Sequence, residues 1–237
     1  ICQRLAVEDT RIVFVSKENE GVSTTRNLGI KMANGKYVAF VDADDLLPEY
    51  AVENMVKVID GTKYDAVFAQ HAYLYEENKL VERLPRVECG TYTYDMLKDK
   101  LLDDGTLTGM LFGSVCGALY RRDTIVSNHI LFDGSMTVNE DGFFNMEFIR
   151  NADQIYVMEK PYVYLYRQWK DKRQVSFEKG KNFDTATQII KEYLMRCNLL
   201  KLYEQQLFKR NVSVAFWKAL EVGNASPSQM IGGGISI

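Results

Sequence analysis

Residues 37–46 read YVAFVDADDL, a short apolar run followed at once by three aspartates. A continuous apolar run of this length is typical of a strand that is buried on both faces of a parallel sheet. Asp42, Asp44 and Asp45 repel one another at the end of that strand unless a cation or a donor-rich ligand lies among them. Ligands bind at this edge of open α/β sheets. Taken alone, an acidic turn that caps a helix near Pro48 is the simpler interpretation.

The first third of the chain alternates strand-like and helix-like segments. Apolar segments predict strands at 12–15, 37–41 and 64–69, and the spacing of apolar residues predicts helices at 21–34 and 48–59. Strands that alternate with helices indicate a mostly parallel sheet flanked by helices, so the expected fold class is α/β.

The pattern is less regular in the rest of the chain. The segments predicted there are strands at 116–120, 155–158 and 162–166, a helix at 141–151, and an almost wholly helical stretch at 182–222. We therefore expect an α/β domain over residues 1–177, followed by a C-terminal helical extension and tail over residues 178–237.

The composition argues against several classes of protein. The chain has 237 residues and a net charge of −3, which argues against a nucleic-acid binder that relies on a strong basic field. No apolar stretch approaches the roughly 18–20 residues of a membrane span. The four cysteines are scattered and there are only two histidines, so we expect reduced thiols in a cytoplasmic protein and no zinc site.

Two further segments carry candidate functional groups. Glu140 and Asp141 lie at the start of an apolar helical stretch, where a carboxylate either caps the helix or stands ready as a general base. Arg26 and Asn27 belong to STTRN, residues 23–27, at the start of another helix. This second group either caps its helix, binds phosphate, or holds the acidic turn in place.

Five segments of the chain follow one another in this order: GVSTTRNLGIKMANGKYVAFVDADDLLPEY, LYRRDTI, NEDGFFN, YLYRQW and VSF. Through these segments the chain resembles bacterial family 2 glycosyltransferases of the polysaccharide-building type. Those enzymes have the GT-A fold, which is Rossmann-like. The resemblance runs in register from Ile1 to Phe177. Thr25 replaces a common alanine, and residues 174–177 keep one of two expected serines. Family members open with a strand and a βα turn that would lie upstream of Ile1, so we expect the chain to be truncated at its N-terminus.

The resemblance implies transfer of a sugar from a nucleotide-diphosphate sugar, with a UDP-sugar expected, to an acceptor hydroxyl with inversion. It implies Mg²⁺ or Mn²⁺ held by Asp44, with Asp42 toward the metal or the ribose and Asp45 in support. A cation there would neutralise charge on the leaving diphosphate.

The resemblance assigns roles to the other candidates too. Asp141 is the expected base for the acceptor hydroxyl, and Glu140 would orient the acceptor or its loop. Arg26 and Asn27 would brace the acidic turn at the donor site. Two residues of the stretch 164–177, Arg167 and Ser176, would reach the diphosphate.

Several alternatives stay open. The same fold could serve as a catalytically inactive nucleotide-sugar-binding module or partner subunit, or as a sugar-nucleotidyltransferase. The expected acceptor is a glycan or a lipid-linked glycan, at the inner face of the cell membrane if the chain is peripheral. Apolar and basic residues of the C-terminal helices leave membrane contact or a homodimer open, although core packing is the simpler use of the apolar ones.

Overall fold

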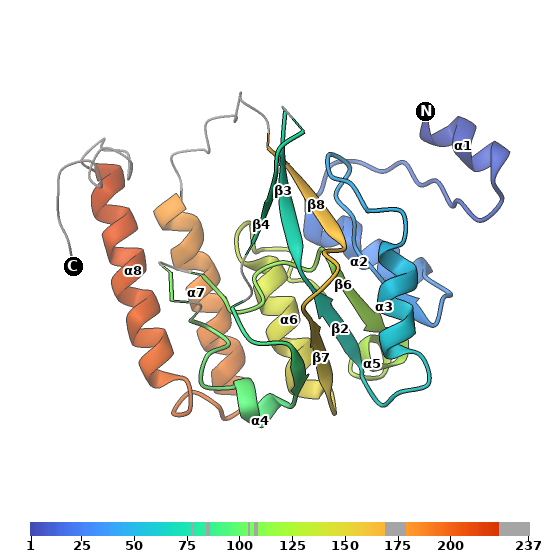
Figure 1. The fold of residues 1–237 in the computed structure, drawn as a ribbon. Helices are drawn as coiled ribbons and strands as arrows, with labels where there is room; N and C mark the ends of the chain where they lie inside the picture. The colour runs from blue at the N-terminus through green and yellow to red at the C-terminus, as the bar shows by residue number, and fades with distance from the viewer. Residues whose placement is uncertain (77, 84–85, 104, 107–108, 169–178, 223–237) are drawn as a thin grey trace.

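The computed structural model describes residues 1–76, 78–83, 86–103, 105–106, 109–168 and 179–222. Helices flank a central five-stranded sheet, and a smaller three-stranded sheet continues from it (Figure 1). The helices are α1 (Cys2–Glu8), α2 (Val22–Met32), α3 (Ala51–Ile59), α4 (Tyr94–Leu97), α5 (Arg122–Ser127), α6 (Glu140–Asn151), α7 (Lys179–Arg196) and α8 (Glu204–Val222). The strands are β1 (Tyr37–Val38), β2 (Ala66–Ala69), β3 (His71–Tyr75), β4 (Leu80–Glu82), β5 (Gly90–Tyr92), β6 (Ala118–Arg121), β7 (Ile155–Met158) and β8 (Tyr164–Gln168).

The central sheet has the order β1-β6-β2-β7-β5. Strand β2 runs parallel to β7, whereas β6 is antiparallel to both β1 and β2, and β5 is antiparallel to β7. The α/β class is confirmed, but the sheet is mixed where we expected a mostly parallel one. The reason is that β6 comes late in the chain and inserts between β1 and β2. The local sequence pattern does not predict this placement.

Side chains of β2 point alternately to the two faces of the sheet and contribute to the hydrophobic core on each face. Val67 packs with Met55 and Ile59 of α3 on one face. Phe68 points to the other face and belongs to the larger core with α6, where Phe144 is fully buried. Because successive side chains of a strand point to opposite faces, one short strand anchors helices on both sides.

The C-terminal helices α7 and α8 lie side by side next to α6 (Figure 1). Tyr193 of α7 packs edge-on against Phe143 of α6, with ring centroids 5.1 Å apart. Arg210 of α8 is 2% exposed and donates hydrogen bonds to Asn139 Oδ1 at 2.5 Å and to Thr187 Oγ1 at 2.9 Å. Helix α8 therefore holds the residue that precedes α6. The division of the chain at residues 177 and 178 stays a prediction.

Two strand predictions need correction. The strand expected at 12–15 is wrong, because this segment is extended without strand pairing and its four apolar side chains are 41–70% exposed. A strand requires hydrogen-bonded neighbours, and the described part of the chain supplies none there. The strand expected at 37–41 is shorter, since only Tyr37–Val38 pair with β6 and Phe40 makes an isolated bridge to Cys116.

Among the described residues, no helix has both the length and the apolar character that crossing a membrane requires.

Tight packing under α6 yields a first prediction, a loss of stability in Gly142→Ala. An added Cβ would lie 2.7 Å from Sδ and 2.9 Å from Cβ of Met110, which is 1% exposed. Overpacking costs about 1–3 kcal/mol, which outweighs the roughly 1 kcal/mol that alanine gains over glycine in a helix. Urea unfolding should report a lower free energy of unfolding.

Gly29→Ala in α2 is the matched control, because a Cβ there meets no atom within 4 Å. We expect it to be neutral or to stabilise the protein by about 0.4–1 kcal/mol. Equal stability of the two variants would show that Met110 moves aside freely, contrary to this packing.

Candidate active site

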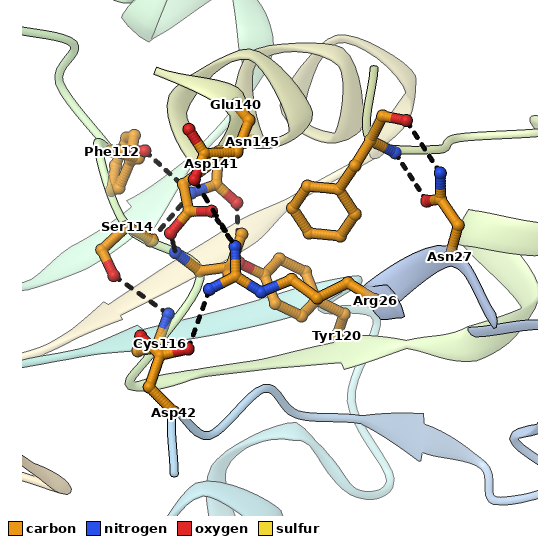
Figure 2. A network of polar contacts seen from close by, with 12 residues as sticks. Arg26, Asn27, Asp42, Phe112, Ser114, Cys116, Tyr120, Glu140, Asp141 and Asn145 are labelled. Carbon is orange, nitrogen blue, oxygen red and sulfur yellow. Dashed lines mark hydrogen bonds and ion pairs between the residues drawn. The ribbon is translucent and has the colours of Figure 1, made fainter. Parts of the chain in front are cut away.

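Three chain segments that lie far apart in the sequence meet at one edge of the central sheet (Figure 2). Arg26 comes from α2, Asp42 from the acidic turn after β1, and Asp141 from the first turn of α6. The guanidinium of Arg26 lies between the two carboxylates. Arg26 of the STTRN segment therefore contacts the acidic turn, and its part in donor binding stays a prediction.

Arg26 bonds both carboxylates with separate nitrogens. Its Nη2 donates to Asp42 Oδ1 at 3.0 Å, and its Nη1 donates to Asp141 Oδ1. Glu140 Oε1 lies 3.8 Å from the same Nη1, and the guanidinium stacks 5.4 Å from the ring centroid of Phe132. The side chain of Arg26 is only 11% exposed, so these pairs are less screened by water than a surface ion pair.

Asp141 is a buried carboxylate whose two oxygens have different partners. Oδ1 accepts from Arg26, and Oδ2 accepts the Val115 backbone N–H at 3.2 Å. Burial raises the pKa of Asp141 to about 6, with Glu140 contributing in the same direction, while Arg26 and the Val115 N–H act against it. A carboxylate with this pKa is ionised at neutral pH yet basic enough to accept a proton, which suits a general base.

The acidic turn is fastened by a tyrosine of β8. The Tyr164 hydroxyl donates to Asp45 Oδ2 at 2.9 Å and accepts the Asp42 backbone N–H at 3.0 Å. The Arg167 backbone N–H donates to Asp45 Oδ1 at 2.9 Å. Burial is the main reason that the pKa of Asp45 is raised. Asp45 therefore helps to shape the turn, and its supporting role toward a metal ion stays a prediction.

Asp44 differs from its two neighbours. Asp44 is exposed, and no side chain or backbone group of the described residues makes a hydrogen bond or an ion pair with its carboxylate. Across those residues no three His, Cys, Asp or Glu side chains converge on one metal position. Mg²⁺ and Mn²⁺ are bound in many enzymes through one or two carboxylates, with substrate phosphates and water as the other ligands. A single free carboxylate at the sheet edge fits that kind of ion.

The remaining predicted site residues are placed differently. Asn27 points away from the acidic turn and pairs with the backbone of Phe132 in both directions, at 2.8 Å each (Figure 2). The bracing of the turn expected from Asn27 is thus not seen, and its part in donor binding stays a prediction. Arg167 reaches the turn through its backbone. Ser176 lies outside the described residues.

Sequence reasoning missed Tyr164 as a partner of the turn and gave no role to Asn145. Asn145 is fully buried, accepts from the Tyr120 hydroxyl at 2.6 Å, and donates to the carbonyls of Phe112 and Ser114 at 2.8 and 2.9 Å. These bonds fix the loop whose Val115 N–H holds Asp141. The last residue of NEDGFFN was the available signal, because a polar side chain at a core position needs partners.

The α/β fold, with an acidic turn and a helix-borne carboxylate at one sheet edge, is that of the GT-A class. Residues 1–126 match the profile of Glycosyl transferase family 2, and the chain belongs to this family. The chain is similar to the uncharacterized glycosyltransferase EpsJ of Bacillus subtilis, at 27% identity over 168 residues, or 71% of this chain and 48% of EpsJ. It is also similar to the minor teichoic acid biosynthesis protein GgaB of Bacillus subtilis, at 26% identity over 172 residues, or 72% of this chain and 18% of GgaB.

Solved structures agree on the fold. The crystal structure of S. aureus TarS 1–349 in complex with UDP-GlcNAc matches with a TM-score of 0.59 at 22% identity, covering 82% of this chain and 54% of that one. The GT-A fold expected from the sequence is confirmed. The chain spans about half the length of EpsJ and of TarS 1–349.

Proposed function

We propose that this chain carries the catalytic centre of an inverting glycosyltransferase that moves a sugar from a UDP-sugar to an acceptor hydroxyl. The observation that carries the proposal is Asp141, a buried carboxylate of raised pKa that Arg26 joins to the acidic turn. The UDP-GlcNAc bound to S. aureus TarS supports the class of donor. The name of GgaB supports a role in the synthesis of a surface polymer.

In the proposed reaction, Asp141 accepts the proton of the acceptor hydroxyl. The acceptor oxygen forms a bond to the anomeric carbon from the face opposite the diphosphate. The bond between that carbon and the diphosphate oxygen breaks, and its electron pair leaves with UDP, so the configuration is inverted. Arg26 fixes the direction of the base, and its charge keeps Asp141 ionised at neutral pH.

Asp44 would hold Mg²⁺ or Mn²⁺, and a bound ion would neutralise the charge that develops on the leaving diphosphate. Asp42 has one oxygen on Arg26 at 3.0 Å and the other near the Cys116 thiol at 3.6 Å. Asp45 has both oxygens engaged by Tyr164 and Arg167. These two residues would therefore act mainly by holding the turn that presents Asp44, and Glu140 would line the acceptor side.

The expected acceptor is a glycan or a lipid-linked glycan, met in the cytoplasm at the inner face of the membrane. Much of the apolar surface of the C-terminal segment serves core packing, as shown by Tyr203 and Leu207, which are 1% and 6% exposed. Phe208 and Phe216 of α8 stay exposed, so peripheral membrane contact or a homodimer through this helix remains part of the proposal.

The proposal predicts metal-dependent binding of UDP at the acidic turn. Calorimetric titration of UDP with Mn²⁺ present should show binding that is lost when the metal is omitted. Asp44→Ala should weaken it about tenfold or more, which is the loss of one charge-assisted contact worth about 1.4 kcal/mol or more. The carboxylate is free of other partners in the described structure, so the variant should keep its fold.

Asp123→Ala in α5 is the control, because it removes an exposed carboxylate of the same charge away from the turn. It should bind UDP like the parent chain. Equal affinity of Asp44→Ala and Asp123→Ala would contradict the donor site. Metal-dependent binding without any sugar transfer would favour the inactive binding module, and release of pyrophosphate would favour the nucleotidyltransferase.

A further inference from the structure

A basic pocket lies between the hairpin of β3 and β4 and the segment 109–117. Its volume is about 280 Å³. Its charged and polar lining includes His71, Arg83 and Arg86 on the hairpin side and Ser114 on the other. None of the described residues that line it is an aspartate or a glutamate. We call these four residues and the space between them the arginine–histidine pocket.

The pocket adjoins the loop that holds the proposed base. Ser114 and Cys116, which both line it, flank Val115, whose N–H holds Asp141. Asn139, another lining residue, precedes Asp141 by two positions. The acidic turn contributes no lining residue among those described. A group bound here would therefore lie beside the loop whose Val115 N–H holds Asp141, and Cys116 of the same loop also contacts Asp42 through its thiol at 3.6 Å.

Positive charge accumulates in this pocket. Arg83 Nη1 lies 3.1 Å from His71 Nε2, so His71 accepts this bond in its neutral form. Burial, followed by Arg83 and Arg86, lowers the pKa of His71 to about 4. Burial and then Arg83 lower the pKa of Arg86. The positive charge of the two guanidiniums disfavours protonation of the imidazole. The same charge favours the binding of an anion.

Aromatic rings fix the position of the imidazole. The ring of Tyr166 meets His71 edge-on at 4.8 Å, and that of Tyr73 meets it at 6.0 Å. The Tyr166 hydroxyl in turn bonds Ser114 Oγ across the pocket wall. The histidine is thus held by packing in a defined place, as expected for a binding group and not for a free surface side chain.

We propose that the arginine–histidine pocket binds an anionic group of the acceptor, a phosphate or a carboxylate, next to the hydroxyl that Asp141 deprotonates. Guanidinium pairs bind the planar or tetrahedral oxygen sets of such groups through two parallel hydrogen bonds. This inference rests on the proposed function for the identity of the acceptor. The pocket's affinity for an anion can be measured without any turnover.

The test is proton–nitrogen NMR of the two histidines of the chain during titration with inorganic phosphate at constant ionic strength. A bound anion stabilises the imidazolium, so phosphate should raise the pKa of His71 by about 1 or more. His129 is exposed and lies away from the pocket lining, so it is an internal control that should not respond. Glucose, which is neutral, should affect neither residue.

Two arginine variants test whether the response of His71 comes from phosphate bound in the pocket. Arg83→Gln and Arg86→Gln should each weaken phosphate binding about tenfold, and the double variant should abolish the response of His71. The response should persist with UDP and Mn²⁺ present. Equal responses of His71 and His129, or an unchanged response in the double variant, would overturn the pocket. Displacement of phosphate by UDP would overturn its assignment to the acceptor.

The calorimetric titration of UDP on the same samples separates the two proposals. A response of His71 without UDP binding would leave the anion pocket standing and remove the proposed transferase. UDP binding without any response of His71 would remove the anion pocket and leave the proposed transferase standing.

Discussion

Asp141→Asn should reduce sugar transfer by about 10²–10⁴-fold, which is the usual contribution of a positioned general base. Asparagine keeps the size of the side chain but has one acceptor oxygen in place of two, so it can accept from Arg26 or from the Val115 N–H and not from both, and it cannot take a proton from the acceptor. Donor binding should be unchanged, because the proposed reaction places Asp141 on the acceptor side. The measurement is UDP release from a UDP-sugar, with water or an added glycan as acceptor, beside a calorimetric UDP affinity.

Glu147→Gln on the same helix is the matched control. It removes an acidic group whose pKa is also raised by burial, but Glu147 lies near Arg150 and Arg196 and away from the site. It should transfer sugar at the parent rate. Parental turnover by Asp141→Asn would remove Asp141 from the role of base, whatever its position.

The second large effect is expected for Arg26→Met. The substitution leaves Asp42, Glu140 and Asp141 facing one another without a cation. Breaking a buried ion pair costs about 3–5 kcal/mol, and we expect at least about 2 kcal/mol here because Asp42 is 39% exposed and partly screened. Urea unfolding at pH 7 measures the loss. Transfer should fall as well, since the base loses its orientation.

The pH dependence makes this prediction specific. Because Arg26 lowers the pKa of Asp141, its removal should move that pKa above the value of about 6 in the parent chain. As the pH falls, Asp141 should therefore become protonated at a higher pH in Arg26→Met than in the parent, the repulsion should shrink, and the variant should regain part of its stability. Arg11→Met serves as control, because Arg11 pairs with Asp9 at the surface and is 89% exposed. Exposed pairs contribute about 0–1 kcal/mol. A loss in Arg26→Met no larger than in this control would contradict the bridging role of Arg26.

Local pattern predicted the parts of the site that sit at element ends. The apolar run before Asp42 located the acidic turn, and the NEDGFFN segment located the start of α6, because strand ends and helix starts leave clear traces in composition. The bond between Arg26 and Asp141 spans 115 positions in the chain. No periodicity encodes such a distance, so only the structure connected the two.

Tyr164 shows why the rest could not be predicted. Its place in a tyrosine-rich strand was foreseen, but its hydroxyl bonds Asp45 and the Asp42 N–H only because β8 passes beside the acidic turn, where Leu46 and Leu165 form an isolated bridge. The antiparallel insertion of β6 between β1 and β2 is of the same kind. Both depend on which elements become neighbours in space, and single-sequence patterns describe only neighbours along the chain.

The role of Asp141 as the base is tested most directly by the pH profile of sugar transfer. Between pH 5 and 8 the rate of UDP release at saturating donor should rise with a midpoint near 6, the pKa to which burial raises Asp141. The residual rate of Asp141→Asn should lack that rise. A flat profile in the parent chain, or the same rise in Asp141→Asn, would contradict the assignment.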